Sequence, residues 1–72
     1  MFKKYRKKQG YTQETLAEIL GISTRHLQRI EKDENEPSLE LLRKLIKVLN
    51  IEDKDIVKFV RKEIKWKKFV IN

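Results

Sequence analysis

The 72-residue chain contains no cysteine, a single proline and only two glycines. Without cysteine, neither a disulfide framework nor a thiolate metal site can stabilise the fold, which therefore depends on packing. The longest uninterrupted apolar run is three residues, at positions 69–71, far short of the roughly 20 residues of a transmembrane helix. No apolar stretch follows the first residues, so the sequence predicts no signal peptide. A chain this short has little room for a preformed pocket, so we do not expect an enzyme.

Positive charge is concentrated at the two ends of the chain. The 18 lysines and arginines outnumber the 11 acidic residues, which gives a net charge of +7. Residues 1–10 carry +5, residues 54–72 carry a further +5, and residues 11–53 carry −3. This distribution favours a polyanionic partner, either nucleic acid or an anionic membrane surface. A surface that is charged only for solubility is the alternative.

The apolar residues of the first sixty positions recur at intervals of three and four, which is the period of amphipathic helices. Thr12, Ser23 and Ser38 each place a hydroxyl where it can accept a hydrogen bond from the first turn of a helix. Gly10 and Gly21 are positioned to end the first and second helices. These signals predict five helices with short connections between them. The sequence therefore predicts one compact all-α domain.

Residues 13–32 read QETLAEILGISTRHLQRIEK and carry the most informative pattern in the chain. Ala17 is small enough to let two helices approach closely, and Gly21 accepts the positive φ that a tight turn between them needs. Five apolar side chains are expected to point inward across the turn: Leu16, Leu20, Ile22, Leu27 and Ile30. Their packing would leave the outer face of the second helix free to enter a DNA major groove.

Residues 2–57 resemble the phage-repressor (Cro-like) helix-turn-helix family, through R-x-x-x-G-Y-T-Q-E-x-L-A-x-x-L-G-I-S, then I-E, then P-S and L-N-I. The resemblance implies a five-helix, lambda-repressor-like DNA-binding domain over residues 1–60, with its helix-turn-helix at 13–32. It further implies a sequence-specific regulator of transcription, a repressor acting by occlusion, that binds double-stranded DNA as a homodimer. We expect such a protein in the cytoplasm, associated with the nucleoid when bound to DNA, and we expect neither a cofactor nor a metal.

The resemblance also implies a recognition helix that begins at Ser23 and reads base edges. Its expected base-reading residues are Thr24, Arg25, Gln28 and Arg29. Each arginine can contact N7 and O6 of a guanine, Gln28 can pair with an adenine, and Thr24 can meet a thymine methyl. The alternatives are a solvated helix face or ion pairs for the two arginines, and for Gln28 an orientation away from the groove.

A second set of residues is expected at the DNA backbone. The expected phosphate contacts are Thr12, Gln13, Ser23, Lys32 and Asn35. Gln13 follows the cap of its helix, where side chain and helix amides together can bind a phosphate. For Thr12 and Ser23, capping is the competing role.

Three further features of the resemblance concern residues near the end of the recognition helix. Arg6 and Glu31 occupy positions that the family often links by a partly buried ion pair, which would brace the domain. Asp33 stands where the family usually has glycine, and it tolerates the left-handed conformation less readily. The acids Asp33, Glu34 and Glu36 would repel phosphate, although they leave open a contact with polymerase.

Residues 61–72 are expected to form a C-terminal extension that mediates dimerisation. On a helix, the apolar residues between positions 56 and 70 cover a face about 180° wide, more than the roughly 100° that packing on one domain needs. The residues expected at the dimer interface are Phe59, Ile64, Trp66, Phe69 and Val70. The alternatives are that the aromatic residues only cap the core, or that residues 64–71 form an edge strand.

Two other functions remain open on sequence grounds. The wide apolar face suits a protein-interaction module, such as an antitoxin whose C-terminal helix binds a partner protein. The basic, aromatic segment 65–69 suits a peripheral membrane contact, although we expect DNA and not membrane as the partner. An enzyme has no support, because the sequence shows no nucleophile–base pair, phosphate-binding loop or metal cluster.

Overall fold

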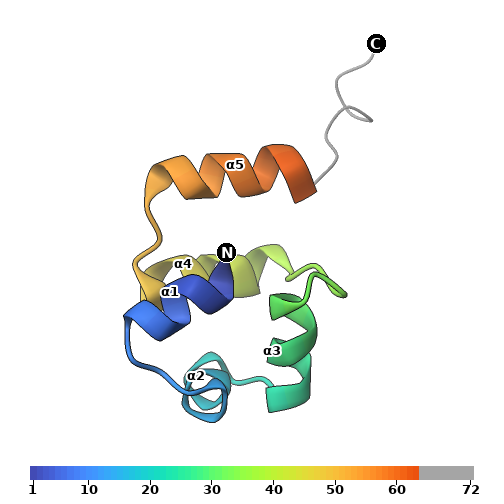
Figure 1. Cartoon of the computed structure of the whole chain (residues 1–72). Helices are drawn as coiled ribbons and strands as arrows, with labels where there is room; N and C mark the ends of the chain where they lie inside the picture. Colours follow the sequence, from blue (N-terminus) through green and yellow to red (C-terminus); the bar gives the residue numbers. More distant parts are fainter. Residues whose placement is uncertain (64–72) are drawn as a thin grey trace.

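The computed structural model describes residues 1–63, which fold into five helices joined by short connections (Figure 1). The helices are α1 Phe2–Lys8, α2 Gln13–Leu20, α3 Thr24–Glu31, α4 Leu39–Leu49 and α5 Asp53–Glu63. Residues 1–63 contain no strand. The expected all-α, five-helix fold is therefore confirmed, whereas the choice between helix and strand for residues 64–71 lies outside the described residues.

Three helices begin with the predicted hydroxyl caps. Thr12 Oγ1 accepts a hydrogen bond from the Thr15 amide at 3.0 Å, and Ser23 Oγ accepts one from the His26 amide at 3.0 Å. Ser38 Oγ likewise accepts from the amide three residues on, at 3.1 Å. Such a cap stabilises a helix by about 1 kcal/mol, because it satisfies an amide that has no partner within the helix. The starts of α2, α3 and α4 were thus predictable from local sequence.

The turn between α2 and α3 depends on Gly21. Its φ of 74° lies in the left-handed region, and the amides of Gly21 and Ile22 donate back to Glu18 and Ala17 carbonyls at 3.1 and 3.0 Å. A Cβ built on Gly21 would meet no atom within 4 Å. Glycine is therefore favoured here by the backbone conformation and not by lack of space.

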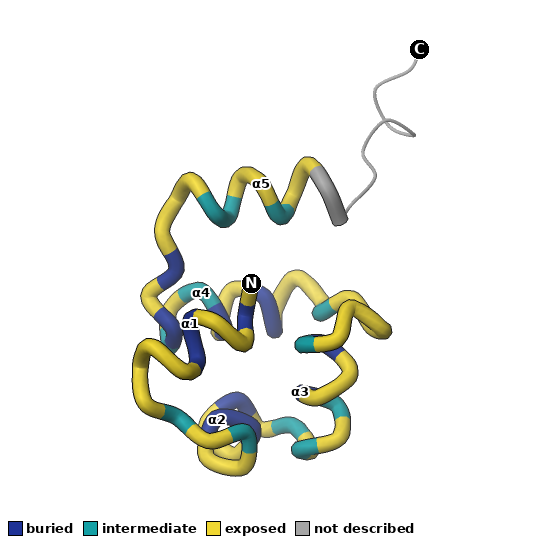
Figure 2. Tube along the Cα trace, in the orientation of Figure 1, coloured by how far each residue is buried: buried dark blue, intermediate teal, exposed yellow. Residues whose placement is uncertain are grey.

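Helices α1 to α4 enclose one core, and the buried positions of the chain face inward (Figure 2). Its most completely buried side chains are Leu16, Leu27, Ile30, Leu45 and Leu49. Four of the five residues expected to point inward across the α2–α3 turn are buried, and Ile22 is half-buried. Burial of this kind supplies the main favourable free energy of so small a domain.

Helix α5 packs Ile56 and Phe59 against the core, and it contacts α1 through an aromatic pair and a hydrogen bond. The rings of Phe2 and Phe59 meet edge to face, with centroids 5.3 Å apart and an interplanar angle of 62°. The Tyr5 hydroxyl donates a hydrogen bond to Asp55, and it accepts one from the Glu52 amide at 3.2 Å. The hydrogen bond with Asp55 raises the pKa of Tyr5 and lowers the pKa of Asp55. The outer side of α5 keeps Val57 and Val60 exposed. None of the described helices is both long and apolar enough to cross a membrane.

Candidate nucleic-acid interface

Helix α3 buries one face in the core and exposes the opposite face to solvent. Leu27 and Ile30 are 0% and 1% exposed and hold the helix against the core. Arg25, Gln28 and Arg29 are exposed on the other side. Thr24, the fourth residue expected to read bases, is half-buried at the start of the helix. The structure therefore places three of the four expected base readers on an accessible surface.

No acid of the described part of the chain forms an ion pair with the two arginines of this face. Residues 1–63 contain two ion pairs, and neither involves Arg25 or Arg29. Both arginines line an open hollow of about 390 Å³, together with Gln28, Lys32 and Glu34. Because the arginines are four residues apart on one helix, their guanidinium groups share this face. A guanidinium without a carboxylate partner retains its donors for an acceptor-rich ligand.

Behind this face, Glu31 and Arg6 form an ion pair between α3 and α1. Arg6 Nε donates to Glu31 Oε2 at 2.7 Å, and Arg6 Nη2 lies 3.3 Å from Glu31 Oε1. Arg6 Nη1 also donates to the Tyr11 carbonyl at 3.0 Å, which ties down the connection to α2. The exposed fractions of the two side chains are 9% and 2%. The pair is therefore buried, and it braces the end of α3 instead of facing solvent.

Two glutamines extend this ion pair to the surface. Gln13 Nε2 donates to Glu31 Oε1 at 3.0 Å, and Gln28 Nε2 donates to Gln13 Oε1 at 3.2 Å. A carboxylate can only accept, so the amide nitrogen of Gln13 must face Glu31 and its oxygen must face Gln28. Gln28 must then turn its own nitrogen to Gln13. The buried carboxylate thereby determines how both amides are oriented, and no group among residues 1–63 engages the oxygen of Gln28, which can still accept.

These contacts change how the expected phosphate-binding residues can act. One N–H of Gln13 is engaged by Glu31, so one remains for a phosphate. The Thr12 hydroxyl donates to Thr15 Oγ1 at 3.0 Å while it caps α2, so its hydrogen is engaged as well. Ser23 accepts a hydrogen bond as a cap and keeps its hydroxyl hydrogen available. Lys32 and Asn35 are exposed beyond the end of α3.

The connection from α3 to α4 is acidic and begins with a left-handed residue. Asp33 has a φ of 62°, and its amide donates to the Ile30 carbonyl at 3.1 Å. The Glu34 amide donates to the Arg29 carbonyl at 2.8 Å. These two bonds form a Schellman motif, in which glycine is the usual left-handed residue. Asp33, Glu34 and Glu36 are all exposed next to Lys32 and Asn35.

The structure describes only part of the expected dimerisation surface. Phe59 is half-buried and turned towards Phe2 within its own domain. The other expected residues, Ile64, Trp66, Phe69 and Val70, lie outside the described residues. The exposed apolar surface of α5 is formed instead by Val57 and Val60, which are 47% and 36% exposed. A helical projection of the sequence does not show which side of α5 packs on its own domain. That depends on the position of α1, which carries Phe2.

No described group of acidic or histidine side chains is arranged to hold a metal. Within residues 1–63, no cluster of three or more potential ligands occurs. His26, the one histidine of the chain, is half-buried at the start of α3. The hollow on α3 is lined by three cationic side chains, one amide and one acid: Arg25, Arg29, Lys32, Gln28 and Glu34.

Comparison with known proteins gives two matches. The model of the helix-turn-helix family matches residues 2–56. A protein of Archaeoglobus fulgidus, named as an uncharacterized HTH-type transcriptional regulator, is 36% identical over 66 residues, which cover 92% of each chain. No solved structure gave a significant match.

Proposed function

Because the chain belongs to the helix-turn-helix family of DNA-binding transcriptional regulators, we propose that it reads a specific double-stranded sequence with α3 and acts as a repressor. The observation that carries this proposal is the pair Arg25 and Arg29. They are exposed, free of acidic partners among residues 1–63, and supported from behind by the buried Leu27 and Ile30. Rigid support matters because base readout requires the donors to be held in position before DNA binds.

In this proposal α3 lies in the major groove, with Thr24, Arg25, Gln28 and Arg29 towards the bases. Each arginine contacts N7 and O6 of a guanine, which contributes about 1–3 kcal/mol of discrimination. The amide oxygen of Gln28 is free, so it favours a base that offers a donor. In the major groove these donors are N6 of adenine and N4 of cytosine.

The phosphate contacts lie on both sides of the groove. The amino end of α2 and the remaining N–H of Gln13 bind one phosphate, since unpaired helix amides attract anions. Thr12, Ser23, Lys32 and Asn35 are proposed as further contacts. The acids next to Lys32 weaken binding on that side, and the basic stretch of residues 1–10 offsets this at longer range.

We propose that the protein binds as a homodimer through α5 and the apolar residues Ile64, Phe69 and Val70 of the extension 61–72. Val57 and Val60 carry this proposal, because they leave apolar surface exposed on a helix that is already attached to its own domain. A two-fold dimer would place its recognition helices about 34 Å apart, one turn of DNA. Repression then follows from occlusion of the site, on DNA in the cytoplasm.

A partner protein is the second candidate for the same apolar surface, as in an antitoxin. Measuring the mass of the purified complex distinguishes the two. A dimer of this chain alone supports the homodimer, whereas a stoichiometric second protein supports the interaction module.

Selection from random double-stranded DNA at two salt concentrations tests the DNA-reading proposal. We expect the same sequence at both concentrations, with two half-sites about 10–10.5 base pairs apart. We also expect an affinity that falls steeply with salt, since counterions are released on binding. Recovery of DNA with no enriched sequence would show that binding is only electrostatic.

A further inference from the structure

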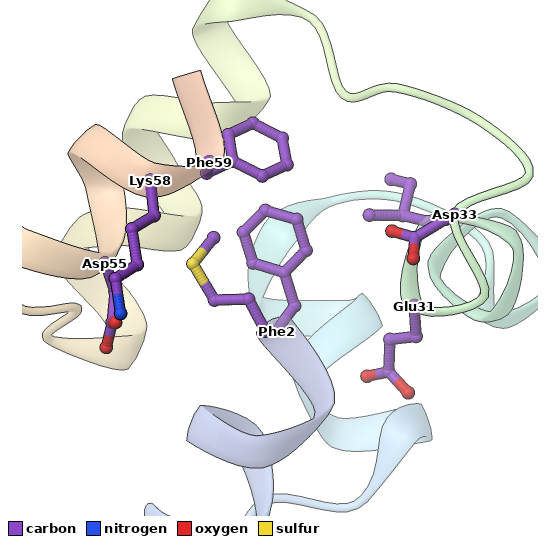
Figure 3. Close-up of a pocket in the computed structure, with 8 residues that line it drawn as sticks. Phe2, Glu31, Asp33, Asp55, Lys58 and Phe59 are labelled. Carbon is purple, nitrogen blue, oxygen red and sulfur yellow. The ribbon is translucent and has the colours of Figure 1, made fainter. Parts of the chain in front are cut away.

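A cavity of about 240 Å³ lies on the side of the domain formed by the start of α1, the end of α3 and α5 (Figure 3). Four of the residues that line it are apolar: Met1, Phe2, Ile30 and Phe59. The other four, here called its rim, are charged: Glu31, Asp33, Asp55 and Lys58. In Figure 3 the rings of Phe2 and Phe59 lie between Asp55 of α5 on one side and Glu31 and Asp33 on the other. Arg25, Gln28 and Arg29 take no part in it.

The size and chemistry of the cavity suit one aromatic side chain that carries a hydrogen-bond donor. At 240 Å³ it is smaller than the roughly 300–1,000 Å³ of cavities that hold whole ligands. Aromatic walls favour edge-to-face packing of another ring. The carboxylates of the rim can only accept, and tryptophan is the large apolar side chain whose single polar group can only donate.

The acids of the rim are engaged to different degrees. Glu31 is paired with Arg6, and one oxygen of Asp55 accepts from Tyr5. Asp33 forms no ion pair within residues 1–63 and is exposed. Considering residues 1–63 alone, the rim therefore has one carboxylate and one further carboxylate oxygen available to a donor or a cation.

The residues that directly follow α5 carry matching chemistry. The sole tryptophan of the chain is Trp66, and Lys65, Lys67 and Lys68 flank it. Phe59 lines the cavity four residues before the end of α5 at Glu63, which is about 6 Å along the helix. Three further residues can span up to about 10 Å, so Trp66 is within reach of the cavity.

We propose that this cavity is the docking site of Trp66 of the same chain, with the flanking lysines beside Asp33. The occupant is a covalently attached segment, so its effective concentration is in the millimolar range. Trp66 of a second copy would have to be present at a comparable concentration to displace the attached segment. Docking would connect the segment after α5 to the end of α3 and would leave Val57 and Val60 exposed. It does not require DNA, because the cavity and the base-reading face of α3 share no residue.

The fluorescence of Trp66 in the full chain tests the proposal directly, since no other tryptophan contributes. We expect blue-shifted emission and protection from acrylamide quenching, relative to the chain in urea, and no change on dilution. Emission equal to that in urea would overturn the proposal. Protection that disappears on dilution would also overturn it, because the occupant would then belong to a second copy.

Acrylamide quenching of Trp66 in two variants tests whether the indole lies in this cavity. Asp33→Asn removes the free carboxylate but keeps a residue that tolerates the left-handed conformation; we expect it to weaken docking about two- to fivefold, as for an exposed ion pair. Glu34→Gln is the matched control, because Glu34 lies in the same connection but not at this cavity. Quenching that rises equally in both variants, or in neither, would contradict the location.

Nuclear magnetic resonance provides a second, independent measurement. An indole in the cavity shifts the methyl resonances of Met1 and Ile30 by its ring current, and Trp66→Leu should abolish these shifts. Methyl groups on the far side of the core, such as those of Leu20, serve as controls. Unchanged Met1 and Ile30 resonances in Trp66→Leu would place the indole elsewhere.

Discussion

Glu31 joins three helices through one buried carboxylate. It pairs with Arg6 of α1, accepts from Gln13 of α2, and lies at the last position of α3. A buried charge is tolerated when its remaining hydrogen-bonding positions are satisfied. No buried side-chain nitrogen or oxygen among the described residues lacks a partner. The brace and the orientation of the surface glutamines therefore depend on the same group.

Replacement of Arg6 by leucine should destabilise the domain by about 3–5 kcal/mol, because it leaves the Glu31 carboxylate buried without its cation. The double variant Arg6→Leu, Glu31→Leu should lose less, since no uncompensated charge remains. Urea denaturation of both variants measures the difference. A single variant that is no less stable than the double variant would show that the carboxylate is not confined to the interior.

Replacement of Arg25 by alanine should relax sequence preference at one base pair per half-site, by about 1–3 kcal/mol. Lys32→Ala is the control. Loss of a phosphate contact should weaken binding to all sequences alike and reduce the salt dependence by about one counterion. Competition between DNA sites that differ at single positions measures both effects. An equal loss on all sequences for Arg25→Ala would refute base readout by this residue.

Each end of α3 illustrates how local sequence controls an element. The turn before it has glycine at a φ of 74°, and the turn after it has aspartate at 62°. Both positions are left-handed, which is unfavourable for a side chain that carries a Cβ. Sequence reasoning anticipated both positions, since the conformations follow from residues close together in the chain.

Two substitutions at these turns should have opposite effects on stability. Gly21→Ala should destabilise the domain by about 1–2 kcal/mol from backbone strain alone, given the open space around the position. Asp33→Gly should stabilise it by about 0.5–1 kcal/mol, because relief of the left-handed strain outweighs the unfolded-state entropy that glycine adds. Thermal denaturation at constant pH compares them. Effects of the same sign would show that neighbouring contacts dominate over backbone conformation.

The attachment of α5 makes the stability of the assembled domain depend on pH. The pKa of Asp55 is lowered by the Tyr5 hydroxyl, so its contribution is present at neutral pH and is lost as pH falls through that lowered value. The pKa of Tyr5 is raised by the same bond, so its contribution is lost as pH rises through the raised value. The bond thus stabilises the attachment between about pH 4 and pH 10.

Tyr5→Phe should therefore be less stable than the parent chain within this window, and the difference should shrink at both ends of it. Urea denaturation across the pH range gives the comparison. Tyr11→Phe is the control, because the Tyr11 hydroxyl makes no hydrogen bond within residues 1–63. A difference that is constant with pH would exclude the Tyr5–Asp55 bond as its cause.

The amino-acid order alone accounts for the helices, their hydroxyl caps and the left-handed turns, because these depend on residues within about five positions of one another. It also accounts for the exposed arginines of α3, since the inward positions of a helix follow from its period. The link from Glu31 through Gln13 to Gln28, the turn of Phe59 towards Phe2, and the cavity beside them became visible only in the folded domain. These features join residues 15 to 57 positions apart, and such contacts depend on how the helices cross and not on any local pattern.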